Sequence, residues 1–313
     1  MTAPAPVIII TEPLDAEPTA WLTQRASVII APPTDPAFAA AAPVARALIV
    51  RTHTRVDAAL LARLPALAVI GRAGVGLDTI DAAAAAARSI AVLNTPQANS
   101  AAVAEFVFAS LLRALRPIEP LTTALDLNAW EARRRAFTSP LELSGLTLSI
   151  LGLGRIGTRV ANIARAFDMS VLYNDIAPVP APQGCTRVSF DELLTRADIL
   201  SLHIDGRATN HNLIDAAALA LLKPDAILIN TSRGSVIDEP ALATHLSTNP
   251  AALAILDVHA QEPIPAASPL LHHPRAILTA HEASCTAAAR RRMSMVVRQV
   301  WECLQANQNK HSD

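Results

Sequence analysis

The chain has few aromatic residues, few cysteines and no excess of charge of either sign. Aromatic residues make up 3% of its 313 residues, and Tyr173 is the single tyrosine. A core without large rings must be built mostly from the leucine, isoleucine, valine and alanine that raise the hydrophobic share to 51%. That share, beside 17% charged residues, excludes an intrinsically disordered chain. At this length we expect two packed domains.

The chain also lacks blocks of like charge, paired cysteine motifs and long apolar runs, and each absence excludes a class of partner or location. The formal net charge is -1 and no long block of like charges occurs, whereas nucleic-acid binding needs a broad basic face. Cys185, Cys285 and Cys303 share no CxxC spacing, so we expect reduced thiols and neither a disulfide framework nor a metal site. No apolar run approaches the roughly 20 residues of a membrane span, and the N-terminus lacks signal-peptide features. We therefore expect a cytoplasmic protein.

Short apolar runs rich in β-branched residues recur along the chain, and stretches with helical spacing lie between them. The runs are continuous rather than alternating, which is typical of parallel strands covered on both faces. The predicted strands are 7–10, 28–30, 47–50, 66–70 and 90–93, and then 147–152, 170–173, 199–203, 226–230, 252–257 and 276–279. Long apolar helices are predicted over Ser100–Leu115, between the two series, and over 285–305, at the end of the chain.

Two successive strand–helix series predict an α/β protein with two doubly wound, Rossmann-like parallel sheets. The simplest arrangement makes the second series an insertion, so that the last helix returns to the first domain. We therefore expect one domain of residues 1–98 plus 286–313 and another of residues 99–285. An active-site cleft would lie between them, because ligand sites favour domain boundaries.

A glycine-rich string, GLGRIG, stands between a predicted strand and a predicted helix. Its glycines are Gly152, Gly154 and Gly157. The first permits a tight turn, the second lets the backbone approach a pyrophosphate, and the third lets the helix pack on the strand. The free N–H groups of the helix N-terminus then face the phosphates. Asp175 lies just after the end of the next predicted strand, where its carboxylate can bind ribose hydroxyls and repel a 2′-phosphate, which favours NAD over NADP. The plainer alternative is a glycine turn with a solvated aspartate.

Three further polar residues follow the ends of consecutive predicted strands, where open α/β sheets bind ligands. Arg233 follows the strand 226–230, Glu262 follows 252–257, and His281 follows 276–279. Reduction of a 2-keto acid needs a cation at the carboxylate and ketone, which Arg233 supplies with its planar fork. It also needs a proton, which His281 can give if Glu262 favours the imidazolium. Singly, each residue has a plainer interpretation as a surface, turn or packing residue, and we interpret the other histidines in that way.

These residues make the chain resemble the D-isomer-specific 2-hydroxyacid dehydrogenase family over nearly its whole length. The matching strings are 71–78, 94–96 with Ala104-Glu105, 151–157, 230–234 with Val236 and Asp238, 256–258 with Glu262-Pro263, and 279–281. The resemblance implies an NAD-dependent enzyme that moves a hydride between NAD(H) and the C2 of a D-2-hydroxy or 2-keto acid. It implies that Arg233, Glu262 and His281 are the catalytic triad.

The resemblance also implies roles for residues outside the triad. The residues implied to contact NAD, besides the glycines, are Arg155, Ile156, Asp175, Thr231 and Asp257, the last at the nicotinamide carboxamide. The backbone N–H groups of Gly74, Val75 and Gly76 would bind the substrate carboxylate beside Arg233, as an anion nest. Residues 1–98 plus 286–313 would then be the substrate-binding domain, and residues 99–285 the NAD-binding domain.

Within the family, the chain looks most like the phosphoglycerate dehydrogenases. The strings 48–52, 71–76 and 129–131, followed by Arg133–Arg135, carry this likeness. It implies D-3-phosphoglycerate and 3-phosphohydroxypyruvate as substrates, with Arg51 and one of Arg133–Arg135 at the phosphate. A solvated surface role for these arginines stays open. So do a reductase of hydroxypyruvate, glyoxylate or another 2-keto acid, and a non-catalytic NAD-sensing protein like the corepressors that share this fold.

Several features depart from or extend the family pattern. Asp205 and Asn210 stand where the family usually has a proline and a threonine, in a loop near the cofactor. Glu282 replaces a small residue after His281, where its carboxylate could raise the pKa of His281 or face solvent. Because the chain stops soon after its last predicted helix, we expect no regulatory domain. The apolar Ser100–Leu115 helix and the segment after Trp130 predict a homodimer.

Overall fold

The computed structural model describes residues 5–139 and 141–309. Their contacts divide the chain into two compact units, Met1–Asn99 with Ser284–Asp313, and Ser100–Ala283. Each unit is built around its own parallel sheet. The predicted fold class, α/β with two Rossmann-like parallel sheets, is therefore confirmed. A cleft between the two units stays a prediction.

The first unit contains a five-stranded sheet in the order β2-β1-β3-β4-β5, and its strand pairs are parallel. Its strands are β1 (Val7–Ile10), β2 (Ser27–Ile30), β3 (Ala45–Val50), β4 (Val69–Arg72) and β5 (Ala91–Asn94). Ile9 and Leu48 pack into the core on one face, and Ile8 and Ile49 into the core on the other. Burial on both faces explains why these strands are unbroken apolar runs.

Short helices connect the strands of this sheet. They are α1 (Ala16–Thr23), α2 (Pro36–Ala41), the 3₁₀ turn η1 (Ala42–Val44), α3 (Ala58–Ala62) and α4 (Ala82–Ala87). Each α-helix begins after an aspartate whose side chain accepts a backbone N–H of the first turn; these N-caps are Asp15, Asp35, Asp57 and Asp81. Helices this short are marginal alone, so the caps fix where each one starts.

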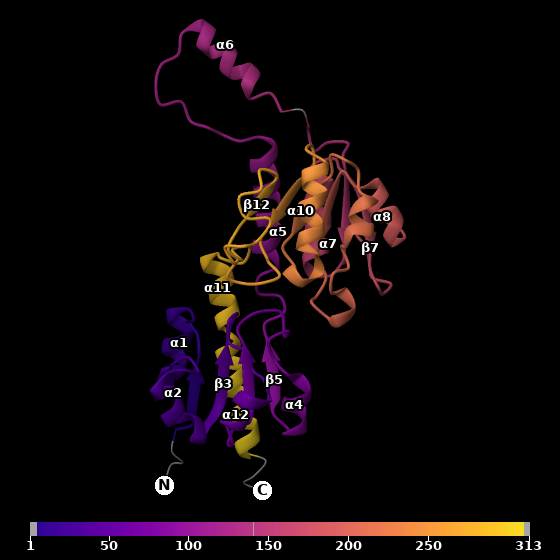
Figure 1. The fold of residues 1–313 in the computed structure, drawn as a ribbon. Helices are drawn as coiled ribbons and strands as arrows, with labels where there is room; N and C mark the ends of the chain where they lie inside the picture. The colour runs from indigo at the N-terminus through magenta and orange to yellow at the C-terminus, as the bar shows by residue number, and fades with distance from the viewer. Residues whose placement is uncertain (1–4, 140, 310–313) are drawn as a thin grey trace. The chain divides into compact units, whose positions relative to one another are not determined.

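The end of the chain returns to the first sheet. The last helix, α12 (Val296–Asn309), buries Val297 and Leu304 in the same core as Ile8 and Ile49 (Figure 1, yellow against indigo and purple). Gly71 on β4 permits this close packing, because a Cβ at that position would lie 2.5 Å from Cγ2 of Val300. The predicted return of the C-terminal segment to the first sheet is confirmed.

The single helix predicted over 285–305 is wrong. The segment forms two helices, α11 (Ala287–Ser294) and α12, with Met295 between them. The hydroxyl of Ser294 donates to the carbonyl of Arg290 at 2.8 Å and accepts the N–H of Asp15 at 2.9 Å. A serine that bonds back to the preceding turn often bends a helix, and at this break Ser294 also contacts a residue far away in the sequence.

The second unit contains a seven-stranded sheet in the order β12-β11-β10-β9-β6-β7-β8, again with parallel pairs. Its strands are β6 (Thr147–Leu151), β7 (Ser170–Asn174), β8 (Cys185–Arg187), β9 (Ile199–Leu202), β10 (Ile227–Asn230), β11 (Leu253–Leu256) and β12 (Ala276–Leu278). The chain runs outward from β6 to one side and then, from β9, to the other. The ends of β6 and β9 are therefore the switch point, where such sheets bind their ligands.

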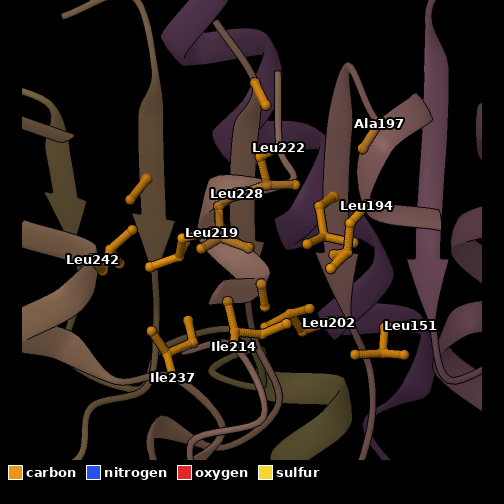
Figure 2. Close-up of a cluster of buried hydrophobic side chains, with 14 of the residues drawn as sticks. Leu151, Leu194, Ala197, Leu202, Ile214, Leu219, Leu222, Leu228, Ile237 and Leu242 are labelled. Atoms are coloured by element: carbon orange, nitrogen blue, oxygen red, sulfur yellow. The ribbon is translucent and has the colours of Figure 1, made fainter. Parts of the chain in front are cut away.

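Helices cover this sheet, with the exception of α6, none of whose residues is buried. The helices of the unit are α5 (Ser100–Leu115), α6 (Leu127–Ala136), α7 (Arg155–Ala166), α8 (Phe190–Arg196), α9 (Ala216–Ala220) and α10 (Glu239–Thr248), with the 3₁₀ turns η2 (Ala208–Asn210) and η3 (Gly234–Val236). Figure 2 shows one core, in which Leu202 and Leu228 of the sheet meet Leu194, Leu219 and Leu242 of the helices. Aliphatic side chains build this core, as the scarcity of aromatic residues predicts.

The predicted strands differ from the observed ones mainly at their ends. Residues 66–68 precede β4, and β8 has no counterpart among the predictions. β8 is a three-residue strand at the sheet edge, and its residues are exposed or half-buried. It therefore lacks the apolar run by which the other strands are recognised. Within the described residues, no helix combines the length and the hydropathy that a membrane span requires.

Candidate active site

The glycine-rich string forms the turn between β6 and α7. Gly152 has a φ of +91°, and a Cβ there would lie 2.8 Å from the carbonyl oxygen of His203. A Cβ on Gly157 would collide with the carbonyl of Gly152, because α7 packs closely on the turn. At Gly154 nothing lies within 4 Å of the Cβ position, so the backbone is accessible there. The three glycines thus meet the three requirements of a dinucleotide turn.

The surroundings of this turn fit a dinucleotide. Gly154 is the N-cap of α7 and no side chain caps the helix, so its first N–H groups remain suited to an anion. Asp175 lies beside the turn, where its Oδ2 accepts the N–H of Leu153 at 2.8 Å. The hydroxyl of Thr231 is buried and has no hydrogen-bond partner among the described residues. A buried polar atom without a partner calls for an additional group, and NAD would supply one.

Glu262 and His281 form a hydrogen-bonded pair beyond the ends of β11 and β12. His281 Nδ1 lies 3.0 Å from Oε2 of Glu262, and Oε1 accepts the N–H of His259 at 3.1 Å. Partial burial would raise the pKa of Glu262, but the hydrogen bond and charge of His281 and the His259 N–H outweigh it and lower that pKa. The carboxylate is therefore ionised at neutral pH. His281 has a φ of +56°, a left-handed conformation that non-glycine residues rarely adopt and that is common at functional sites.

Arg233 lies in the turn that follows β10, the strand next to β11. Asn230 holds this turn: its Oδ1 accepts the N–H of Ser232 at 2.9 Å, and its Nδ2 donates to the carbonyl of Arg233 at 2.9 Å. A Cβ at Gly234 would collide with the carbonyl group of His259. The turn that carries Arg233 therefore packs directly against the residue whose N–H holds Glu262. The structure brings the three predicted strand ends together as neighbours.

Asp257 determines the path of the backbone around His281. It is 1% exposed, and its Oδ1 accepts the hydroxyl of Thr279 and the N–H of Glu282, both at 2.6 Å. Its Oδ2 accepts the N–H of Ala283 at 2.8 Å. A carboxylate has about four acceptor positions, and three are occupied here. That Asp257 also contacts the nicotinamide carboxamide stays a prediction.

His259 has a structural role close to the triad. It is 7% exposed, and its Nε2 lies 2.8 Å from the carbonyl oxygen of Thr279. It thus links the end of β11 to the end of β12 while its backbone N–H holds Glu262. The interpretation of His259 as a structural residue agrees with this burial. No sequence pattern indicated its contact with Glu262, since only the folded turn brings the two together.

A comparison with family models gives one match to this unit. Residues 108–283 match the NAD binding domain of the D-isomer specific 2-hydroxyacid dehydrogenases. The match covers more than half of the chain and contains the glycine-rich turn and the three residues of the predicted triad. The chain belongs to the D-isomer specific 2-hydroxyacid dehydrogenase family. The resemblance seen in the sequence is therefore confirmed, and residues 108–283 correspond to the NAD binding domain of the family.

Named relatives within the 2-hydroxyacid dehydrogenase family fall into more than one substrate group. The D-3-phosphoglycerate dehydrogenase of Mycobacterium leprae is 40% identical over 291 residues, which are 92% of this chain and 54% of the relative. The glyoxylate reductase of Aeropyrum pernix is 36% identical over 259 residues, which are 80% of this chain and 77% of the relative. The chain spans about half the length of the curated phosphoglycerate dehydrogenases that it matches.

Several solved structures share the fold over nearly the whole chain. The TT0316 protein of Thermus thermophilus superposes with a TM-score of 0.83 at 32% identity, covering 96% of this chain and 97% of that one. The D-lactate dehydrogenase of Aquifex aeolicus, complexed with NAD and lactic acid, gives a TM-score of 0.82 at 26% identity, covering 97% and 96%. An acyclic imino acid reductase complexed with NADPH gives 0.81 at 27% identity, covering 96% and 97%.

Apart from Arg233 and the arginines of α6, the residues predicted to bind substrate lie in the first unit. The N–H of Gly74 donates to the carbonyl of Arg72 at 2.8 Å, so an anion nest would use the N–H groups of Val75 and Gly76. The guanidinium of Arg72 covers Gly74, where a Cβ would collide with it. Arg72 was not among the predicted site residues. Arg51 is half-buried, and its Nη1 donates to the carbonyl of Pro13 at 3.2 Å.

Glu12 organises the loop that contains Arg51. Its carboxylate accepts the N–H groups of Arg51 at 3.1 Å, Thr52 at 2.9 Å and Thr54 at 3.0 Å, and both of its oxygens lie 3.2 Å from the N–H of His53. Burial would raise the pKa of Glu12, but the N–H groups of His53 and Thr54 and the other bonds lower it. The loop conformation therefore depends on the negative charge of Glu12.

Glu12→Gln is expected to lower the free energy of unfolding by about 1–3 kcal/mol at pH 7, since an amide cannot satisfy four donors. Because the folded-state pKa of Glu12 is lowered, this stabilisation is present above the ordinary glutamate pKa of about 4.3 and is lost as the pH falls further. Urea unfolding at pH 7 and pH 3.5 measures the effect. Glu302→Gln, at an exposed site on α12, is the control. A deficit that grows at acid pH would contradict this account.

The remaining predicted residues are distributed over the second unit. Arg155 is exposed at the first position of α7, Ile156 follows it half-buried, and Glu282 is exposed. On α6, Arg133 stacks on the ring of Phe137 with its Cζ 4.6 Å from the ring centroid, and Arg134 forms an ion pair with Glu131 at 3.2 Å. Their contact with a substrate phosphate stays a prediction. Among the described residues, no cluster of His, Cys, Asp or Glu is suited to a metal ion.

Proposed function

We propose that this chain is an NAD-dependent dehydrogenase that interconverts a D-2-hydroxy acid and the matching 2-keto acid. The observation that supports it most strongly is the ionised Glu262 bonded to His281 at 3.0 Å. This pair lies at the carboxyl ends of neighbouring strands of an NAD-binding sheet, and the Arg233 turn packs against it. A positively charged fork and a proton donor beside a dinucleotide turn are what reduction of a 2-keto acid requires.

Each residue of the triad has one chemical task in this proposal. When bound, NADH supplies the hydride that reduces the ketone. Arg233 binds the substrate carboxylate with two N–H groups and polarises the ketone oxygen. Because Nδ1 of His281 is bonded to Glu262, Nε2 is the nitrogen that gives its proton to the developing alkoxide. In the oxidation direction the same nitrogen takes that proton back from the hydroxyl.

The dinucleotide is held by the glycine-rich turn and the residues around it. The uncapped N–H groups of α7 would face the diphosphate, and Asp175 would bind the adenosine ribose. The buried hydroxyl of Thr231, which has no hydrogen-bond partner among the described residues, would bond to the dinucleotide. We propose that Arg155, Ile156 and Asp257 also contact the dinucleotide, as the family resemblance implies. A cytoplasmic location, where free thiols stay reduced, is part of the same proposal.

For the substrate we propose D-3-phosphoglycerate and 3-phosphohydroxypyruvate. The 40% identical relative in Mycobacterium leprae bears the phosphoglycerate name, and the Glu12-held loop offers Arg51 for a phosphate. A glyoxylate or hydroxypyruvate reductase is the second candidate, because the Aeropyrum pernix relative is named a glyoxylate reductase. The backbone N–H groups of Val75 and Gly76 would bind the substrate carboxylate in either case.

A steady-state screen of 2-keto acids with NADH and with NADPH tests this proposal. We expect turnover with NADH, and kcat/KM at least about tenfold higher for 3-phosphohydroxypyruvate than for hydroxypyruvate, since a charge-assisted contact contributes at least 1.4 kcal/mol. Arg51→Ala is expected to reduce that ratio, whereas Arg46→Ala, at an exposed position in the same unit, leaves it unchanged. No preference for the phosphorylated acid would favour the reductase. NADH binding without turnover on any acid would favour an NAD-sensing protein.

We also propose a homodimer in which α6 packs on a second copy. None of the residues of α6 is buried, while Leu127 is 76% exposed and Trp130 is 48% exposed. By contrast, α5 buries Val107, Phe108 and Leu111 in the core of its own unit, so much of its apolar character is already accounted for. Sedimentation at micromolar concentration is expected to give a dimer mass, and Trp130→Glu a monomer. A monomeric unmodified chain would end this proposal.

A further inference from the structure

The loop after β9 lies directly against the dinucleotide turn. A Cβ on Gly152 would come within 2.8 Å of the carbonyl of His203 and 2.8 Å of Cγ2 of Ile204. The ring of His203 is buried: burial lowers its pKa to about 4, and its Nδ1 has no hydrogen-bond partner among the described residues. The loop therefore begins against the dinucleotide turn, at the switch point of the sheet. The first charged residues after His203 in this loop are Asp205 and Arg207.

Asp205 and Arg207 form an ion pair within this loop. Nε of Arg207 donates to Oδ1 of Asp205 at 2.7 Å, and Nη2 donates to Oδ2 at 2.5 Å. Nδ2 of Asn210 donates to the same carboxylate at 3.1 Å and to the carbonyl of Asp205 at 2.9 Å. Asp205 and Asn210 are two of the positions that depart from the family pattern, and they belong to a single cluster. Both charged side chains are about half exposed, at 49% and 50%.

The charges of Arg233 and Asp175 also act on the Asp205–Arg207 pair. The hydrogen bonds of Arg207 lower the pKa of Asp205, and the charge of Arg233 adds to the effect. The bond and charge of Asp205 raise the pKa of Arg207, and the charge of Asp175 adds to that effect. The loop therefore lies within electrostatic reach of the ribose-binding carboxylate and of the catalytic arginine. An unpaired Asp205 would place a second negative charge there, beside the position expected for a diphosphate.

We propose that Arg207 is a determinant of cofactor affinity, because it cancels the charge of Asp205 where the loop borders the dinucleotide site. The two anionic phosphates of NAD(H) then meet a loop without net charge. In this account Asp205 orients Arg207, and Asn210 holds Asp205 in place. The inference rests on the dinucleotide site of the proposed function, but not on the identity of the 2-keto acid.

Fluorescence titration with NADH separates charge cancellation from a merely structural link. At low salt, Arg207→Ala is expected to raise the Kd for NADH about fivefold or more, as one uncompensated charge near a surface would. Asp205→Asn with Arg207→Ala together is expected to return the Kd to near the original value. Arg207→Lys keeps the positive charge, so its Kd for NADH is expected to stay close to that of the original chain. At 0.5 M salt the deficit of Arg207→Ala is expected to shrink, because the charge is screened.

Arg196→Ala is the matched control. Arg196 forms a similar exposed pair with Glu192 at 2.6 Å on α8, before β9 begins and thus at the opposite edge of the sheet, so its loss should leave the Kd unchanged. An Arg207→Ala variant that binds NADH like the original chain would overturn the inference. So would a double variant as weak as Arg207→Ala, which would indicate that the pair only holds the loop. Absence of NADH binding by the unmodified chain would instead contradict the proposed function itself.

Discussion

His281→Gln is expected to lower kcat/KM for the best 2-keto acid by roughly 10²- to 10⁴-fold, the range that loss of a general acid produces. The glutamine amide keeps the volume of the ring and a donor toward Glu262, but it cannot release a proton at neutral pH. The Kd for NADH should change by less than about twofold, since the dinucleotide is held mainly by the turn at Gly152–Gly157. Single-turnover oxidation of NADH, followed by absorbance, measures the loss.

His273→Gln is the control for this variant. His273 lies in the same unit, with Nε2 3.2 Å from the hydroxyl of Ser247 on α10, and it has no task in the mechanism. Its substitution should leave kcat/KM unchanged. Glu262→Gln should lose activity at every pH in the neutral range, because the lowered pKa of Glu262 keeps the original carboxylate ionised there. Full activity in His281→Gln would eliminate the proposed proton donor.

Arg233→Lys is expected to lower kcat/KM by roughly 10²- to 10³-fold, although it preserves the charge. A lysine ammonium is a point charge and cannot offer the planar pair of N–H groups that binds a carboxylate and the neighbouring ketone together. The loss should appear in both KM and kcat, because Arg233 binds the substrate and also stabilises the charge that develops on the oxygen. Steady-state kinetics with the same 2-keto acid separates the two parameters.

Arg196→Lys on α8 provides the matched control, since it changes an arginine that is paired with a carboxylate but remote from the strand ends. It should be indistinguishable from the original chain. If Arg233→Lys raised only KM, Arg233 would serve in binding alone and another group would have to polarise the ketone. A variant with unchanged kcat/KM would remove Arg233 from the triad.

The parts of the fold and site that follow from local pattern could be predicted from the sequence. Unbroken apolar runs mark strands such as Val7–Ile10 because both sheet faces are covered, and the pattern is local to each run. Parallel strands place their carboxyl ends at one edge of the sheet. Residues just after those ends, such as Arg233 and His281, could therefore be grouped before any contact was known.

The parts that depend on contacts between distant residues could not be predicted. Glu12 binds backbone groups 39 to 42 positions away, and Ser294, where α11 ends, is bonded to Asp15, 279 positions away. No periodicity in the sequence encodes either contact. The Asp205–Arg207 pair is local in the sequence. Its proposed effect on cofactor binding, however, depends on the position of its loop against Gly152, which follows a different strand. Each of these features is visible only once the chain has folded.

Transfer of deuterium from [4,4-²H₂]NADH to the substrate tests the proposed hydride transfer most directly. The chain is incubated with this cofactor and 3-phosphohydroxypyruvate or hydroxypyruvate, and the hydroxy acid is examined by NMR and chiral chromatography. The proposed chemistry predicts one deuterium at C2 and the D configuration, and roughly 100-fold or more less labelled product from His281→Gln over the same period. A product without deuterium at C2, or of the L configuration, would contradict it.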